Sequence, residues 1–211
     1  MTRLCDAGGW GLSRIAAQFR DLELYVERSF NLLSALVALA FVVCAMNLPV
    51  TLLPTAAHDD GLFFRLAYSV VQGNWLGDYG ETTLAKGPTF PFFLAVNAAI
   101  GLPITLSLAL FYAFSCWLLT SRLTQLNVPS VLALGLLVLL LFHPHSFPTR
   151  IIRDNIYPAL TLIVLAATVD IFLLRQRRAW ILVLYGIAAG SLWMTREEGV
   201  WVMPAPRSEP E

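Results

Sequence analysis

Two adjacent aspartates, Asp59 and Asp60, stand where a long apolar stretch ends. Like charges side by side are stable only near a cation, a helix N-terminus or a substrate proton. A carboxylate in such a pair can remove a proton from a hydroxyl, and carboxylate oxygens suit Mg²⁺ or Mn²⁺. We therefore predict that Asp59 and Asp60 are catalytic and could also hold a divalent metal. The alternative is that they only cap a helix.

Other charged side chains that could bind a substrate lie in three polar stretches: Arg65 and Lys86 in 55–87, Arg150 and Arg153 in "HPHSFPTRIIRDN" (143–155), and Arg196, Glu197 and Glu198 in "TREEG" (195–199). Arg150 and Asp154 are four residues apart and could pair on a helix. This would leave Arg153 to bind a phosphate, for which a planar guanidinium is well suited. Anchoring to lipid headgroups is the alternative for these arginines and for Lys86.

The histidines are weaker candidates. His58 could bind a metal or orient a carboxylate, although a lone histidine more often does neither. His143 and His145 have a spacing found in metal sites, but two ligands are too few for a structural zinc site. We interpret this pair as interfacial.

The composition is that of an integral membrane protein. Of the 211 residues, 57% are hydrophobic and 13% are charged, whereas a soluble domain carries about 25% charged residues. The mean hydropathy is +0.68. The formal net charge is zero, so nothing indicates nucleic-acid binding. The cysteines, Cys5, Cys44 and Cys116, are far apart and predict neither a disulfide nor a zinc site.

The apolar segments predict an all-α, polytopic bundle. Since a span needs about 20 apolar residues, five segments qualify or nearly qualify: 30–54, 104–121, 129–147, 156–174 and 180–195. A sixth, "PTFPFFLAVNAAIGLP" (88–103), is either a short span or a helix at the interface. The predicted organisation is a cytoplasmic segment (1–29), a membrane domain (30–203) with an outer loop (55–103), and a polar tail (204–211).

The basic residues predict the orientation. Four arginines precede the first span: Arg3, Arg14, Arg20 and Arg28. By the positive-inside rule the N-terminus is therefore cytoplasmic, and "RQRR" (175–178) should share that side. The N-terminus and "RQRR" lie on the same side of the membrane only if residues 88–103 do not cross it. Five spans then place the three polar stretches together on the outer face of the cell membrane.

An amphipathic helix is expected directly after the two aspartates. In "HDDGLFFRLA" and the residues that follow it, Phe63, Leu66 and Val70 repeat at helical spacing, whereas Arg65 falls on the other side. We expect residues 60–72 to form a helix along the membrane surface with these apolar side chains toward lipid.

The order of these features resembles the integral-membrane glycosyltransferases of the GT-C class. The nearest branch comprises protein O-mannosyltransferases, the lipid A aminoarabinose transferase and the lipopolysaccharide-core galacturonosyltransferases. The shared features are an acidic pair in the first outer loop, a Lys86-Gly87-Pro88 segment with Pro91, and an apolar stretch that ends in Ile100-Gly101. Gly87 departs from the family pattern, in which proline is common there. The resemblance covers roughly residues 30–200.

The resemblance implies transfer of a sugar from a polyprenyl-phosphate donor to a lipid, glycan or protein hydroxyl on the outer side of the membrane. Asp59 or Asp60 would be the base, and arginines or a divalent metal would stabilise the departing phosphate. Members of the class usually have more spans and often a soluble outer domain. We therefore expect the 211 residues to correspond to the N-terminal part of such an enzyme. Its expected partners are membrane lipid and the polyprenyl-phosphate donor.

Two other classes of function remain open. A transporter would place charges within its spans, whereas these segments are nearly free of charge, with Asp170 at an end, where we expect it to pair with "RQRR". A non-catalytic membrane subunit or a degenerate fragment is the second alternative. The sequence does not indicate the sugar, the acceptor or the oligomeric state.

Overall fold

The computed structural model describes residues 6–51, 60–75, 77, 87–176 and 178–195, with the backbone alone for 6–17 and for Asp60. Its main elements are α1 (Asp6–Met46), α2 (Asp60–Val71), α3 (Thr89–Ile100), α4 (Ile104–Gln125), α5 (Ser130–Leu141), α6 (Tyr157–Thr168), which continues as a π-helix (Val169–Leu173), and α7 (Ala179–Thr195). The prediction of an all-α helical bundle is confirmed.

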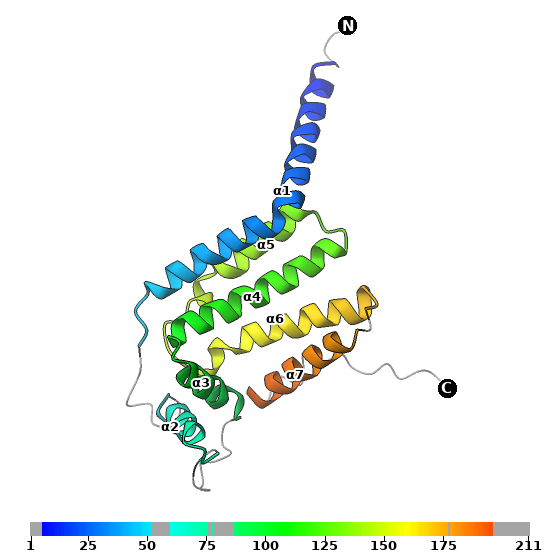
Figure 1. The fold of residues 1–211 in the computed structure, drawn as a ribbon. Coiled ribbons are helices and arrows are strands. Elements are labelled where there is room, and N and C mark those ends of the chain that lie inside the picture. Colours follow the sequence, from blue (N-terminus) through cyan, green and yellow to red (C-terminus); the bar gives the residue numbers. More distant parts are fainter. Residues whose placement is uncertain (1–5, 52–59, 76, 78–86, 177, 196–211) are drawn as a thin grey trace, which may run out of the picture.

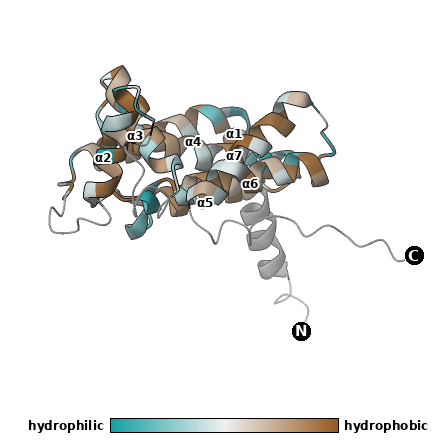
Figure 2. Cartoon of the chain, turned by 90° about the horizontal axis from the view of Figure 1, so that it is seen from below, coloured by the Kyte–Doolittle hydropathy of each residue, from teal (hydrophilic) through white to brown (hydrophobic). Residues whose placement is uncertain are grey.

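Five of the helices form an antiparallel bundle, which is seen from the side in Figure 1. α1 packs on α4 and α5, α4 also packs on α6, and α6 packs on α7. The short helices α2 and α3 pack against each other at one end of the bundle (Figure 1). We call this the α2–α3 end. Hydrophobic residues predominate along the bundle helices (Figure 2).

Three helical segments of the described chain are long and apolar enough to cross a membrane: Gln18–Met46, Ile104–Gln125 and Arg153–Leu173. The prediction of a membrane protein is thus supported. α5 and α7 have 12 and 17 residues, which gives lengths of about 18 and 26 Å against a hydrocarbon core of about 30 Å. The number of five spans therefore stays a prediction.

The predicted boundaries of two spans differ from the observed helices. No proline occurs before Pro49, and α1 runs without a break from Asp6, so residues 6–29 continue the helix of the first span. α5 ends at Leu141, although its span was expected to reach residue 147. The cause is local, because His143 precedes a proline and takes an extended conformation, and a residue before proline disfavours the α region.

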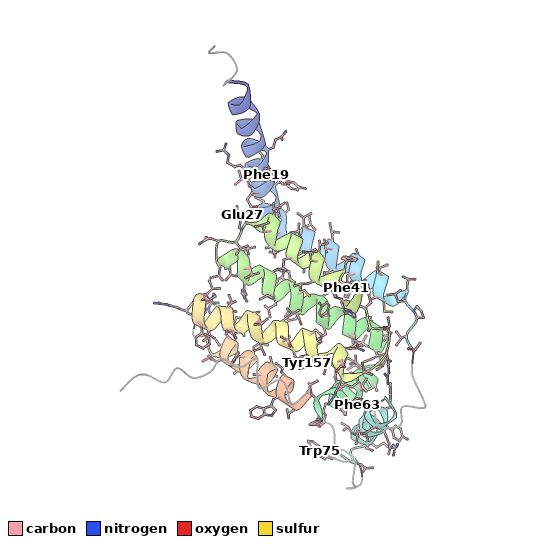
Figure 3. All side chains as sticks on the ribbon, turned by 180° about the vertical axis from the view of Figure 1, so that it is seen from behind. Phe19, Glu27, Phe41, Phe63, Trp75 and Tyr157 are labelled. Atoms are coloured by element: carbon pink, nitrogen blue, oxygen red, sulfur yellow. The ribbon has the colours of Figure 1, made fainter. Side chains whose placement is uncertain are left out.

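α2 forms where an amphipathic helix was predicted, but its apolar face contacts protein. Phe63 is 1% exposed and its ring meets the ring of Phe90 in α3 edge-on, with centroids 5.2 Å apart. Leu66 is buried as well. The expectation that these side chains face lipid is therefore wrong, because α3 supplies an apolar surface for them. Figure 3 shows Phe63 at this end of the molecule, away from Phe41 of α1.

α3 is a short helix, as one of the two interpretations of residues 88–103 expected. Its 12 residues give a length of about 18 Å, the same as that of α5, so whether it crosses the membrane stays a prediction. Gly101 ends it in the left-handed region (φ 69°), and its N–H bonds to the carbonyl of Ala98. Glycine adopts this backbone conformation without steric cost.

The alternating directions of the helices place the predicted cytoplasmic residues at one end. Arg20 and Arg28 in the first part of α1, and Arg175 and Arg178 between α6 and α7, lie at the end opposite α2 and α3 (Figure 1). The two ends of the bundle thus agree with the positive-inside assignment. The side of the membrane on which each end lies stays a prediction.

Labelling of single cysteines tests this orientation. In a variant without native cysteines, a membrane-impermeant maleimide added to intact cells should label Thr149→Cys at the α2–α3 end. It should label Arg178→Cys only after the cells are permeabilised. Both positions are exposed, so access to the reagent would decide the outcome. Labelling of Arg178→Cys in intact cells would contradict the predicted topology.

Candidate functional site

The first polar stretch begins beside the second. Thr51, at the start of the connection between α1 and α2, donates its backbone N–H and its hydroxyl to the carbonyl of Thr149, at 2.9 and 3.0 Å. Thr51 also forms an isolated parallel β-bridge with Arg150. The chain that leads to the two aspartates therefore starts next to Arg150.

The second polar stretch meets the third through Arg153. Residues Arg153–Asn155 form a short 3₁₀ helix, and one Nη of half-buried Arg153 lies 3.5 Å from the carbonyl oxygen of Thr195, the last residue of α7. Asn155 donates its side-chain amide to the carbonyl of Arg150. Residues 150–155 are not an α-helix, so the four-residue spacing of Arg150 and Asp154 does not place them on a common helical face.

The third contact joins α7 to the segment that follows Lys86. Thr89 donates its hydroxyl to the carbonyl of Ser191 at 3.1 Å. Gly87 approaches the backbone so closely that a Cβ atom there would overlap with the carbonyl oxygen of Met194. This contact gives a physical reason for glycine at this position, where the GT-C enzymes that the sequence resembles often have proline. It also places the start of α3 beside the last turn of α7.

The structure therefore brings together the described flanks of the three polar stretches, as the predicted alternation of spans requires. Arg65 lies apart from these contacts. It is exposed on α2, on a different side of the helix from the face that packs against α3. The remaining predicted residues lie outside the described part of the chain: Asp59, Lys86, Arg196, Glu197, Glu198 and the side chain of Asp60.

A cavity of about 420 Å³ opens at the same end of the bundle. Polar groups of Tyr112, His143, His145, Asp154 and Asn155 line it, with leucines of α4 and α5 on the apolar side. The two imidazole rings lie 5.2 Å apart, and the backbone N–H of His145 donates to Nδ1 of His143. The sequence interpretation of the histidines as merely interfacial missed this cavity.

Tyr112 was also missed, because it lies in the middle of an apolar span. Its hydroxyl donates to the carbonyl of Leu140 at 3.0 Å, and the hydroxyl of Ser146 donates to the same carbonyl at 2.6 Å. These bonds satisfy the carbonyl at the end of α5. A tyrosine in an apolar run was the available signal, because a buried phenol hydroxyl needs a partner.

An apolar groove of about 240 Å³ begins at Ile156, the residue after the 153–155 turn. It runs between α3, α4, α6 and α7, and its walls include Phe93, Phe111 and Ile163. Ile156 and Ser191 also line it. Since Ile156 follows the turn and Ser191 precedes Thr195 by one helical turn, the groove lies close to the contact between Arg153 and α7.

Substitution of Gly87 should weaken the junction of α3 and α7. We expect Gly87→Ala to lower the free energy of unfolding by about 1–3 kcal/mol, the usual cost of overpacking a close contact. Thermal unfolding of the detergent-solubilised protein measures this. Gly190→Ala in α7 is the matched control, because a Cβ there meets open space and alanine should stabilise the helix by roughly 0.5–1 kcal/mol. Equal stability of the two variants would contradict the close approach.

Within the described part of the chain, no group of three or more metal-binding side chains is found. The predicted metal site of Asp59 and Asp60 lies outside that part. The described geometry offers Arg153 beside the end of α7, a cavity with polar and apolar walls that is lined by Asp154 and Asn155 of the same turn, and an apolar groove lined by Ile156, the residue after the turn. Comparison with protein-family models, curated proteins and solved structures finds no match to this chain.

Proposed function

We propose that the chain is a membrane glycosyltransferase-like protein that uses a polyprenyl-phosphate sugar donor and acts on the outer side of the membrane. The acceptor would be a hydroxyl of a lipid, a glycan or a protein. The observation that carries the proposal is the 153–155 turn at the end of the bundle. Arg153 contacts the last residue of α7, Asp154 and Asn155 line a cavity that has both polar and apolar walls, and Ile156, which follows the turn, lines an apolar groove. This combination suits a ligand with a long apolar tail and a charged head.

The donor would be held by groups of different chemistry. Its isoprenoid tail would lie along the groove between α3, α4, α6 and α7, whose walls are apolar. Its phosphate would lie at the mouth of the groove, where Arg153 supplies two-pronged hydrogen bonding and a permanent positive charge. Arg150, Lys86 and Arg196 belong to segments that begin or end at the same contacts and are candidates for the same role.

The acceptor would enter through the cavity lined by the histidines and by Asp154. The 3₁₀ turn that carries Arg153 also carries Asp154 and Asn155, which line the cavity. One turn of the chain thus separates the proposed donor groove from the proposed acceptor cavity. In the reaction the acceptor oxygen would lose its proton to a carboxylate and form the new glycosidic bond, while the bond from the sugar to the phosphate breaks and the polyprenyl phosphate leaves.

Asp59 and Asp60 are the proposed base and its partner. α2 begins at Asp60, so the pair stands at a helix N-terminus, where backbone N–H groups stabilise negative charge. Two adjacent carboxylates also fit Mg²⁺ or Mn²⁺, which prefer oxygen ligands. A bound metal would add positive charge for the departing phosphate. Glu197 and Glu198 follow α7 and are candidates for contacts with acceptor hydroxyls.

Donor binding by the purified full chain in nanodiscs tests the proposal. A fluorescent polyprenyl phosphate should bind, and Arg153→Ala should weaken binding about tenfold or more, because hydrogen bonds to charged groups contribute about 1.5–3 kcal/mol. Arg178→Ala removes the same charge from the opposite end of the bundle and should bind like the wild type. Titrations with Mg²⁺ and with EDTA would show whether a metal contributes.

The outcomes separate the alternatives. If the probe does not bind, the proposed donor site is wrong and a non-catalytic membrane subunit becomes the better interpretation. If it binds but the Arg153 and Arg178 variants are equal, the chain binds isoprenoid lipids without the proposed phosphate site.

A further inference from the structure

α2 carries a second apolar face, which is separate from the buried face that packs against α3. Phe64, Tyr68 and Val71 are spaced by four and three residues, so they lie on one side of the helix. They are 38%, 64% and 50% exposed, and we call them the exposed stripe of α2. Arg65 and Ser69 lie on a third side, which is polar. The part of α2 that faces away from the protein is therefore itself amphipathic.

A groove of about 300 Å³ joins the exposed stripe to the start of α4. Its lining includes all three residues of the stripe, Ala98 of α3, and Leu102 and Ile104. Asn97 also lines it, but its amide donates to the carbonyl of Phe93 one turn earlier in α3. Leu102 is exposed, and Ile104 is the first residue of α4, which is long and apolar enough to cross a membrane. The apolar surface of the stripe is thus continuous with the beginning of a candidate membrane span.

Two exposed aromatic side chains belong to this surface or lie close to it. Tyr68 is part of the stripe, and Trp75, which follows α2, is 67% exposed with its ring 5.1 Å from the ring of Phe92 in α3, between centroids. Figure 3 shows Trp75 at the α2–α3 end, farther from the bundle than Phe63. Tyrosine and tryptophan are enriched where a membrane meets water, because each has an apolar ring and a polar group. Arg65, on the neighbouring side of α2, can extend its guanidinium to lipid headgroups.

We infer that lipid of the membrane itself covers the exposed stripe and its groove, so that α2 lies at the boundary between headgroups and acyl chains. The stripe faces the acyl chains and Arg65 faces the headgroups, while the buried face around Phe63 keeps its contact with α3. Lipid is the occupant because the groove includes the start of α4, and a span requires acyl chains along its sides. A soluble partner would have to displace lipid from the start of α4 to fill the same groove. The inference does not depend on glycosyl transfer.

Spin labels at two neighbouring positions test the lipid contact. The full chain without native cysteines is placed in nanodiscs of phosphatidylcholine and phosphatidylglycerol, with the label at Val71→Cys or, as the matched control, at Gln72→Cys. Both positions are exposed, and the backbone N–H of Gln72 still donates to the carbonyl of Tyr68. One residue therefore turns the control by about 100° around the helix. Oxygen concentrates among acyl chains, whereas a nickel chelate stays in water, so the ratio of collision rates with oxygen and with nickel should be several-fold higher at Val71 than at Gln72.

The other possible surroundings of the stripe give different results. Frequent collisions with the nickel chelate at both positions would mean that water covers the stripe. Few collisions with either reagent at Val71 would mean that protein covers it, for example a second copy of the chain. Either result would overturn the proposal.

Fluorescence quenching by brominated lipids tests the depth of this end of α2. The chain has six tryptophans, so quenching of the wild type is compared with that of Trp75→Phe, which removes one fluorophore and retains an aromatic ring beside Phe92. Lipids brominated near the headgroup end of the acyl chain should quench the emission of Trp75 more than lipids brominated near the methyl end. If neither lipid quenches this emission, or the second quenches it as strongly as the first, α2 does not lie at the proposed depth.

Discussion

Replacing Asp170 by alanine is expected to lower the free energy of unfolding by about 3–5 kcal/mol, which is the usual cost of breaking a buried ion pair. Asp170 lies in the π-helix that extends α6 and is 3% exposed. One carboxylate oxygen, Oδ2, lies 3.0 Å from Nε of Arg122 in α4. Without Asp170 the guanidinium would stay in an apolar environment with no counter-charge.

The geometry of this pair is imperfect as a hydrogen bond. Nε of Arg122 and the second carboxylate oxygen, Oδ1, are buried and have no aligned hydrogen-bond partner within the described residues. The 3.0 Å separation is therefore best interpreted as attraction between charges and not as a two-pronged hydrogen bond. An ion pair of this kind is weak evidence for net stability, although removal of one partner is costly.

A pair of substitutions separates these two effects. The double variant Arg122→Leu, Asp170→Leu should recover most of the stability that Asp170→Ala loses, because it leaves no buried charge. Asp21→Ala is the control, since Asp21 is exposed on α1 and surface changes usually stay within about 0.5 kcal/mol. Cys116 is fully buried, so its rate of maleimide labelling in a Cys5→Ser, Cys44→Ser background reports unfolding. Equal rates for the Asp170 and Asp21 variants would show that the ion pair contributes nothing.

The partner of Asp170 could not be predicted from its neighbours in sequence. We expected "RQRR" to pair with it, because those arginines follow at helical spacing. The structure corrects this, because the helix ends at the π-turn and Arg175 adopts a positive φ of 52°. A π-turn inserts a residue into the helical repeat and so changes the direction of the side chains within it. Asp170 consequently contacts Arg122, which lies 48 positions earlier in the chain.

Helix positions were predicted best for two apolar segments, of which the first begins directly after a proline. The segment expected at 104–121 is α4, which follows Pro103 and ends at Gln125, and the segment expected at 180–195 is α7. The packing of α2 could not be predicted in the same way. The sequence pattern of its apolar face is the same whether that face contacts lipid or α3, because both offer Phe63 an apolar environment.

The candidate site was predictable as a region but not in its contacts. Alternating spans imply that the three polar stretches lie at one end, and the bonds of Thr51 and of Arg153 join their described flanks. The cavity beside Tyr112 and the close approach of Gly87 to α7 depend on tertiary packing. Neither has a local sequence pattern that would reveal it.

The largest effect on catalysis is expected at the start of α2. Under the proposed function, Asp59→Asn or Asp60→Asn should lower glycosyl-transfer turnover by about 10²-fold or more, the usual scale for a general base. The reason is position, because α2 begins at Asp60 and a helix N-terminus stabilises negative charge. There the donor phosphate would lie at headgroup depth, while the acceptor arrives from water.

The two aspartates can be given separate roles by experiment. Turnover with a polyprenyl-phosphate sugar should not recover at any Mg²⁺ or Mn²⁺ concentration if the substituted residue is the base, whereas raising the metal concentration should restore part of it if the residue is a metal ligand. Asp78→Asn, in the same predicted outer loop, is the matched control and should retain turnover. Expression and membrane insertion should be unchanged in all three variants. If both single variants of the pair turn over like the wild type, Asp59 and Asp60 only cap α2, and the base must be sought among Glu197, Glu198 and Asp154.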